Sequence, residues 1–139
     1  MVELAITDSQ DPAIQRAIER VIDAYNDTRL AEPGNGRILA IPIRDASGKI
    51  AGGLWGYSYA RWLFVHLLVV PESLRGQGIG TRMMKMAEDE ARARGCVGIH
   101  LDTFSFQARP FYEKLGFSRF GSIEDWLPGV SRHFLLKRL

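Results

Sequence analysis

The feature that most constrains the fold is a strand-like apolar run followed directly by a glycine-rich loop and a helical segment. The run covers residues 63–70 and stops at a proline, after which Gly76, Gly78 and Gly80 precede a helical pattern over residues 81–94. The first amide groups of a helix have no partner within it, and the helix dipole is positive at that end. Glycines there let a loop turn its amides toward an anion. The order strand, glycine loop, helix therefore predicts a pyrophosphate site.

Two common phosphate-binding loops do not fit this pattern. The P-loop requires a lysine followed by Ser or Thr after its last glycine, whereas Gly80 is followed by Thr81 and Arg82. The dinucleotide fingerprint is G-x-G-x-x-G near the first strand of a βαβ unit, and here the pattern is G-x-G-x-G in the middle of the chain. On these residues alone, a glycine-rich turn that binds nothing stays the alternative.

Two segments of the chain resemble the signatures of one protein superfamily. Residues 75–80, RGQGIG, resemble the (Q/R)-x-x-G-x-(G/A) loop of the GNAT superfamily of N-acetyltransferases, which binds the pyrophosphate of acetyl-coenzyme A. Residues 111–117, FYEKLGF, resemble the other signature of that superfamily, and they follow the first in the expected order and spacing. Two such motifs together are more specific than either alone. The resemblance covers residues 37–121 well and the two ends weakly.

The resemblance implies an α/β fold of the mixed α+β kind, with a central, mostly antiparallel sheet flanked by helices in a single domain spanning residues 1–139. Periodicity along the chain agrees and gives the order β-α-β-β-β-α-β-α-β-β. The expected strands cover residues 2–7, 37–44, 50–59, 62–70, 97–103, 117–121 and 131–137. The expected helices cover residues 13–29, 81–94 and 106–115. Because a helix joins strands 62–70 and 97–103, we expect these two to be parallel.

Composition and charge limit the partners and the compartment. The 139 residues are 46% hydrophobic and 24% charged, which is ordinary for a globular domain. The net charge of +2 is spread without a run of like charges, so neither nucleic acid nor a membrane is expected as a partner. The single cysteine, Cys96, and the lack of a signal peptide or an apolar span predict the cytoplasm. A homodimer would be unsurprising, and no metal is expected.

The resemblance names acetyl-coenzyme A as the co-substrate and places its contacts. In the superfamily, the strand before the glycine loop and the strand after the following helix splay apart, and the pantetheine arm lies between them. The residues that correspond to coenzyme contacts are Leu68, Val69, Val70, Arg75, Gly76, Gln77, Gly78, Ile79, Gly80, Thr81, Ser105, Ala108 and Phe111. Ser105 stands where the family often carries asparagine, and its shorter side chain makes a water-mediated contact possible.

Tyr112 is the candidate general acid. It stands where the family carries the tyrosine that protonates the departing coenzyme A thiolate. A coenzyme thiol should have a pKa broadly similar to that of a free cysteine, about 8.5, so a nearby hydroxyl can help it leave. Without the surrounding motif, a tyrosine at this position of an amphipathic helix would be read as a core residue.

His66 is the candidate general base. It lies nine residues before Arg75, and arylalkylamine acetyltransferases of the superfamily carry at the matching offset a histidine that serves amine deprotonation. An imidazole with a pKa near 6.5 can accept a proton at neutral pH. A histidine packed in the core is the alternative. Glu32, Asp102 and Glu72 are weaker candidates for the base.

Aromatic residues gather on the two strands before the loop. Alternation puts Trp62, Phe64, His66 and Leu68 on one face of the strand. On the preceding strand Trp55, Tyr57 and Tyr59 also alternate. Together with Trp62 they either line an acceptor pocket for an aromatic or cationic amine or simply pack in the sheet.

These observations predict an N-acetyltransferase that transfers the acetyl group of acetyl-coenzyme A to a primary amine of a small molecule by direct attack, without an acyl-enzyme. One alternative is an acetyltransferase acting on a protein lysine or N-terminus. An alternative from another class is a non-catalytic module that senses acyl-coenzyme A.

Overall fold

The computed structural model describes residues 1–107 and 109–139, so the predicted coenzyme contact Ala108 lies outside the described residues. The chain divides into two compact units, Met1–Gly34 and Asn35–Leu139. The second unit contains the sheet.

The N-terminal unit contains helix α1 (Pro12–Asp27), which begins where its capping residues predict. Asp11 is the N-cap, and its carboxylate oxygen accepts a hydrogen bond from the Ala13 amide at 2.9 Å. Pro12 occupies the first turn, where its missing N–H group would have had no partner within the helix. The predicted helix over residues 13–29 is therefore confirmed with slightly shifted ends.

The strand predicted for residues 2–7 is wrong, because residues 1–10 have no regular secondary structure. Val2, Leu4 and Ile6 alternate with more polar residues, as in a half-buried strand. However, alternation shows only which side chains could lie on the same face of a strand. A strand also needs a neighbouring backbone to pair with its amide and carbonyl groups, and the pattern cannot supply that neighbour.

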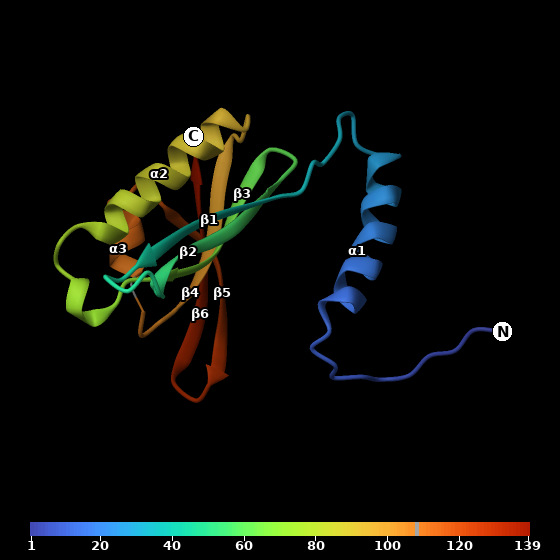
Figure 1. Ribbon diagram of the computed structural model, residues 1–139, viewed down its shortest axis with the longest axis horizontal. Coiled ribbons are helices and arrows are strands. Elements are labelled where there is room, and N and C mark those ends of the chain that lie inside the picture. Colours follow the sequence, from blue (N-terminus) through green and yellow to red (C-terminus); the bar gives the residue numbers. More distant parts are fainter. Residues whose placement is uncertain (108) are drawn as a thin grey trace. The chain divides into compact units, whose positions relative to one another are not determined.

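The second unit is built on a six-stranded sheet with the order β1-β2-β3-β4-β6-β5 (Figure 1). The strands are β1 (Arg37–Arg44), β2 (Ile50–Tyr59), β3 (Trp62–Val69), β4 (Gly98–Phe104), β5 (Ser118–Leu127) and β6 (Val130–Arg138). The helical elements are α2 (Ile79–Ala93), α3 (Arg109–Lys114) and the 3₁₀ turn η1 (Glu72–Leu74). All neighbouring strands are antiparallel except β3 and β4. The mostly antiparallel sheet and the parallel pair around α2 are both confirmed.

Two elements differ in length from their predictions, for local reasons. Helix α3 begins at Arg109, not at residue 106, because the side chain of Gln107 folds back and its oxygen accepts the Phe104 amide at 2.8 Å. The strand predicted for residues 117–121 continues to Leu127, because the connection to β6 is a tight turn. Gly129 in that turn has φ of 77°, a conformation that glycine adopts without strain.

Helix α2 covers one face of the sheet and forms the core with it (Figure 1). Its buried residues, Met83, Met84, Ala87 and Ala91, recur at helical spacing and face the sheet. The buried hydrophobic residues of the core are Leu39, Leu54, Leu63, Val65, Met83, Met84, Ala87, Ala91, Cys96, Ile99, Leu101, Tyr112, Phe117 and Leu135. Tyr112 of α3 is thus part of the core. It also belongs to the FYEKLGF signature, which predicts that it is the general acid.

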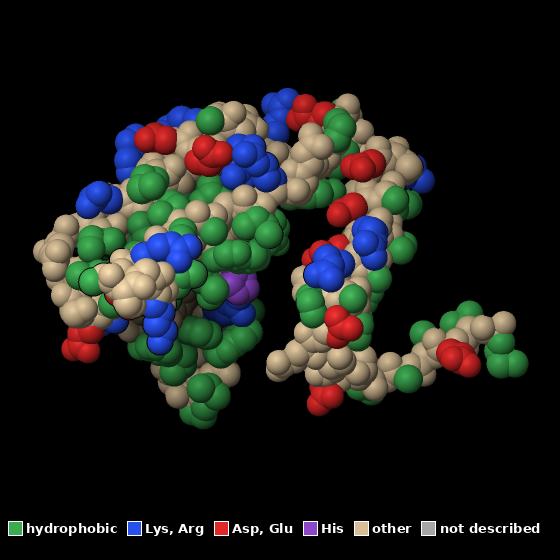
Figure 2. Space-filling model, in the orientation of Figure 1, with side chains coloured by type: hydrophobic (Ala, Val, Ile, Leu, Met, Phe, Trp, Pro, Cys, Tyr) green, Lys and Arg blue, Asp and Glu red, His purple; other side chains and the backbone are tan. Residues whose placement is uncertain are grey.

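The outer face of α2 carries intermixed acidic and basic side chains (Figure 2). Most of these form ion pairs one helical turn apart, such as Lys85 with Asp89 at 2.9 Å. Arg94, at the end of the helix, is different because its side chain is only 10% exposed. Its guanidinium donates to the carbonyl oxygens of Arg37 and Ile38, both at 3.1 Å. Arg94 therefore ties the C-terminal end of α2 to the edge strand β1.

We expect Arg94→Ala to lower the free energy of unfolding by about 2 kcal/mol, because two carbonyl groups of β1 lose a charged donor. Lys85→Ala is the control, since both members of the Lys85–Asp89 pair are more than half exposed and such pairs contribute about 0 to 1 kcal/mol. Urea unfolding measures both variants. Equal losses in the two would show that Arg94 stabilises the protein no more than a surface charge does.

Candidate active site

Strands β3 and β4 separate halfway along their length. Their parallel pairing runs from Trp62 opposite Gly98 to Val65 opposite Leu101 and then stops. On its other side, β3 stays paired with β2 as far as Val69. The second half of β3 therefore has one backbone edge that is not paired with β4. This is the splay that the resemblance implied.

A β-bulge lies at the point of separation. Leu67 pairs with Trp55 and Val65 pairs with Gly56, so His66 is the extra residue of β3. A bulge reverses the alternation of the residues that follow it. Leu68 accordingly lies opposite the buried Leu54 and packs against the core.

The expectation that Leu68 shares a face with His66 is therefore wrong. The His66 ring contacts the rings of Phe64 and Trp55, with centroids 5.6 and 5.9 Å away. These residues lie on the face of the sheet opposite α2. The aromatic rings of β2 and β3 thus contact one another edge-on on that face. Such contacts are also expected if these rings only pack against each other and line no acceptor pocket.

The glycine loop leads into an uncapped helix start. Gly78 is the N-cap of α2, with φ of 74° and no side-chain hydrogen bond to the first turn, and the first turn contains no acidic residue. The positive end of the helix is therefore not neutralised from within. Arg75 crosses the loop, where its Nε donates to the carbonyl oxygen of Val70 at 3.2 Å. These features suit the binding of an anion.

The three glycines of the loop serve two different purposes. Gly76 and Gly78 have positive φ, and an added Cβ at either would meet no atom within 4 Å. Gly80 instead lies inside α2, where an added Cβ would be 3.3 Å from the ring of Phe111. Gly76 and Gly78 thus satisfy the requirement for positive φ and open backbone, whereas Gly80 allows α2 to approach α3.

These parts enclose a cavity of about 820 Å³ between the separated strands, the glycine loop and α3. The predicted site residues that line it are Leu68, Val69, Val70, Arg75, Gly76, Gly78, Ile79, Gly80, Thr81, Phe111 and Tyr112. Residues separated by more than forty positions in the sequence are therefore brought together, as the two motifs predict.

Three predicted residues do not line this cavity. His66 is exposed on the sheet, and Gln77 lies in the loop outside the lining. The hydroxyl of Ser105 accepts a hydrogen bond from the Ser131 amide at 3.0 Å, which ties it to β6. A fourth predicted residue, Ala108, is not described.

The lining also contains residues that the sequence analysis did not assign to the coenzyme site: Leu74, Asp102, Thr103, Phe106 and Gln107. From the sequence, Asp102 is only a weaker candidate for the base. One signal could have indicated it together with Thr103, since both lie near the C-terminal end of β4, beside the end of the parallel strand β3. The ends of parallel strands that separate are a frequent place for ligands. Gln107 could not be found in this way, because its position depends on the side-chain turn described above.

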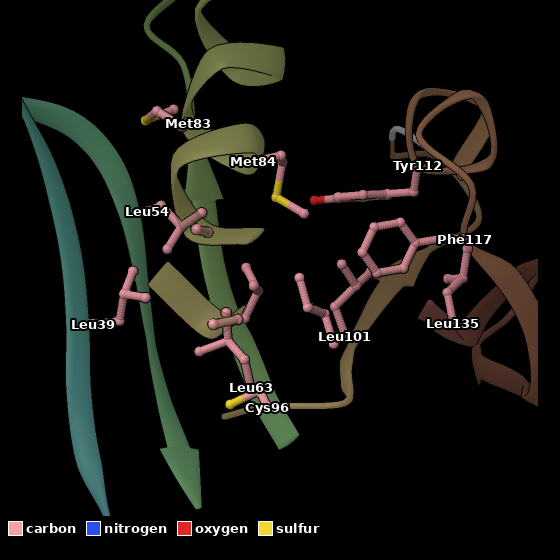
Figure 3. Close-up of a cluster of buried hydrophobic side chains, with 14 residues drawn as sticks. Leu39, Leu54, Leu63, Met83, Met84, Cys96, Leu101, Tyr112, Phe117 and Leu135 are labelled. Atoms are coloured by element: carbon pink, nitrogen blue, oxygen red, sulfur yellow. The ribbon is translucent and has the colours of Figure 1, made fainter. Parts of the chain in front are cut away.

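Tyr112 is buried and lines the cavity. Its ring meets Phe111 and Phe117 edge-on, with centroids 5.1 and 5.9 Å away. Its hydroxyl points toward Met84 of α2 (Figure 3). Burial raises the pKa of Tyr112 to about 12, and the negative charge of Asp102 contributes to the rise. At neutral pH the phenol therefore keeps its proton, and the raised pKa makes it a weaker acid than a free tyrosine.

This pKa predicts a specific loss of stability in alkali. The pKa of Tyr112 is above the ordinary value of about 10, so the folded state holds this proton more tightly than the unfolded state does. The contribution is complete below pH 10 and disappears as pH rises toward 12, by about 2 to 3 kcal/mol. Unfolding free energies from pH 8 upward should therefore fall more steeply for the parent protein than for Tyr112→Phe. Parallel curves would contradict the raised pKa.

The described residues contain neither a metal-binding cluster nor a helix able to span a membrane. Residues 1–107 and 109–139 contain no group of three or more His, Cys, Asp or Glu residues placed to hold a metal ion. In the same residues, no helix has the length and apolar character needed to cross a membrane.

Comparison with known proteins agrees with the geometry. The profile of the acetyltransferase (GNAT) family matches residues 3–117. An acetyltransferase of Agrobacterium fabrum is 40% identical over 137 residues, which is 99% of either chain. The blasticidin-S acetyltransferase of Streptomyces morookaense is 36% identical over 96% of this chain and 93% of its own. The crystal structure of an acetyltransferase from Bacillus cereus superposes with a TM-score of 0.79 at 34% identity, covering 98% of both chains.

The family profile covers most of the sequence, and the relatives match over nearly their whole length in both sequence and fold. This similarity favours an enzyme over a non-catalytic sensor. The chain belongs to the acetyltransferase (GNAT) family and is an acetyl-coenzyme A-dependent N-acetyltransferase.

Proposed function

We propose that the protein transfers the acetyl group of acetyl-coenzyme A to the primary amine of a small molecule by direct attack of the amine on the thioester. The observation that carries this proposal is the cavity between the separated strands, which joins an anion-binding helix start to a buried, protonated tyrosine. One end can hold a pyrophosphate, and the other can protonate a leaving thiolate.

The residues present fit the coenzyme. The open backbone of Gly76 and Gly78 and the uncapped start of α2 offer amide donors to a pyrophosphate, and Arg75 adds a positive charge. The free edge of β3 beyond Val65 offers backbone groups to the amides of the pantetheine arm. Such groups are costly to leave unpaired, and a ligand amide can pair with them. Gln107 also lines this cavity, while its side-chain oxygen accepts the Phe104 amide.

Tyr112 and His66 would divide the proton transfers. As the amine nitrogen bonds to the acetyl carbon, the carbon–sulfur bond breaks and the thiolate takes the proton of Tyr112. The attacking nitrogen must also lose a proton. His66 remains our proposal for the acceptor of that proton, acting through water, because its ring is exposed on the face of the sheet opposite α2.

One observation supports a small acceptor. The relative from Streptomyces morookaense is named for blasticidin S, a small molecule, and this chain covers 93% of it. A protein lysine or N-terminus is the second candidate, and acetylation of peptides but not of small amines would favour it.

We also propose a cytoplasmic location. Cys96 is the single cysteine, it is buried, and burial raises the pKa of its thiol, so it serves as core filler and forms no internal disulfide. Pairing of two copies through edge strands stays a prediction that sedimentation would check.

The experiment has two parts. Titration calorimetry with acetyl-coenzyme A measures the coenzyme site, and release of free thiol during incubation with a panel of small amines measures transfer. We expect binding in the micromolar range and thiol release that depends on an amine. Absence of binding would overturn the assignment of the cavity to the coenzyme. Binding without transfer to any small amine would overturn the proposed acceptor class alone.

A further inference from the structure

The end of β4 presents side chains to both faces of the sheet. Leu101 is buried in the core beneath α2, so Asp102, the next residue, points to the opposite face. Asp102 nevertheless lines the cavity, because the separation of β3 from β4 opens the sheet at this point. Tyr112 reaches the same cavity from the α2 side. A carboxylate and a phenol therefore approach the cavity from opposite faces.

Within the described residues 1–107 and 109–139, Arg132 holds Asp102 through Oδ1. Nε and Nη2 of Arg132 lie 3.0 and 2.9 Å from Oδ1 of Asp102. The guanidinium of Arg132 is itself fixed over the ring of Trp126, 4.7 Å from the ring centroid, and near Phe134 at 5.5 Å. The carboxylate is therefore oriented rigidly, and Oδ2 is left to accept a hydrogen bond from a ligand.

A second carboxylate in the same protein, that of Glu88, has a cationic partner on each of its two oxygens. Nη1 of Arg92 lies 2.7 Å from Oε1 of Glu88, and Nζ of Lys137 lies 2.9 Å from Oε2. Among the ion pairs of the described residues, Asp102 has a cationic partner on Oδ1 alone. A cationic nitrogen on the cavity side would supply a partner for Oδ2.

We propose that Oδ2 of Asp102 binds the ammonium group of the acceptor and holds its nitrogen on the side of the cavity opposite Tyr112, with Arg132 positioning the carboxylate. This inference rests on the proposed function and narrows the acceptor class to cationic primary amines. The rings of Phe104 and Phe106 stack with centroids 5.5 Å apart, and Trp126 lies 6.0 Å from Phe104. Trp126 also contacts Arg132, the partner of the carboxylate, and Phe106 lines the cavity together with Asp102. An acceptor with an apolar group near its ammonium fits these surroundings.

The test compares two probes of the same shape, 2-phenylethylamine and 2-phenylethanol, which differ in whether an ammonium or a hydroxyl is present. Their binding is measured by calorimetry on the protein saturated with coenzyme A. We expect the parent to bind the amine at least about tenfold more tightly than the alcohol, as a charged hydrogen bond implies. In Asp102→Asn this ratio should approach one. Glu88→Gln, which removes a paired carboxylate outside the cavity lining, should keep the parent ratio.

Several outcomes would overturn the proposal. These are a parent that does not bind the amine or does not prefer it, an Asp102→Asn variant that keeps the preference, or a Glu88→Gln variant that loses it. Asparagine matches aspartate in shape and still accepts from Arg132, and thermal unfolding would verify that the variant is folded. Where the parent acetylates the amine, Asp102→Asn should raise KM for the amine and leave KM for acetyl-coenzyme A unchanged.

Failure of this inference can be told apart from failure of the proposed function. Unchanged binding of acetyl-coenzyme A together with an absent amine preference would remove only the role of Asp102. Loss of acetyl-coenzyme A binding in the parent itself would remove the proposed coenzyme site.

Discussion

Gly78→Glu should weaken the binding of acetyl-coenzyme A at least about a hundredfold while the protein stays folded. Gly78 lines the cavity at the N-cap of α2, and a side chain there would extend into open space where the pyrophosphate is proposed to bind. The glutamate would also place a negative charge at a helix start that has no acidic residue of its own. Titration calorimetry measures the effect directly.

The control for this experiment is Gly129→Glu. Gly129 has φ of 77°, close to the 74° of Gly78, and an added Cβ would likewise meet no atom within 4 Å. It lies in the turn between β5 and β6 and does not line the cavity. Backbone strain and added charge are therefore matched, and we expect its affinity for acetyl-coenzyme A to equal that of the parent. Equal weakening in the two variants would show that the loop has no specific role.

Tyr112→Phe should lower kcat for acetyl transfer by about 10²- to 10⁴-fold, the usual contribution of a positioned general acid. The ring contacts with Phe111 and Phe117 are retained, so the affinity for acetyl-coenzyme A should stay within about twofold of the parent. Thiol release under saturating conditions measures kcat, and calorimetry measures the affinity.

Tyr57→Phe is the matched control for the loss of a hydroxyl. Tyr57 is on β2, is 41% exposed and does not line the cavity. We expect its kcat to match that of the parent. If Tyr112→Phe also transfers acetyl groups at the parental rate, the acid role assigned to Tyr112 is wrong and water protonates the thiolate.

The coenzyme half of the site could be predicted because its chemistry is local in the sequence. A helix start, the glycines before it and the strand leading into it are consecutive, so residues 68–81 already contain most of one wall of the cavity. The second wall came from the FYEKLGF signature, whose tyrosine does lie in the cavity lining. The parallel arrangement of β3 and β4 followed from the helix between them.

The acceptor half could not be predicted in the same way, because its contacts join distant residues. Asp102 and Arg132 are thirty positions apart and meet only through the pairing of β4 with β6. Nothing in the local sequence of either residue indicates the other. The strand predicted for residues 2–7 failed for a related reason, since a strand depends on a neighbour as much as on its own pattern.

The bulge at His66 decides which side chains of β3 face the core next to the cavity. Before the bulge, odd-numbered residues such as Leu63 and Val65 are buried, and after it the even-numbered Leu68 packs against the core. In a strand of the same length without the bulge, regular alternation would continue through His66 and turn Leu67 and Val69 inward in place of Leu68 and Val70. The wall of the cavity would then be built from the wrong side chains even though every motif stayed intact. The extra residue at the bulge is thus part of the information that specifies the site.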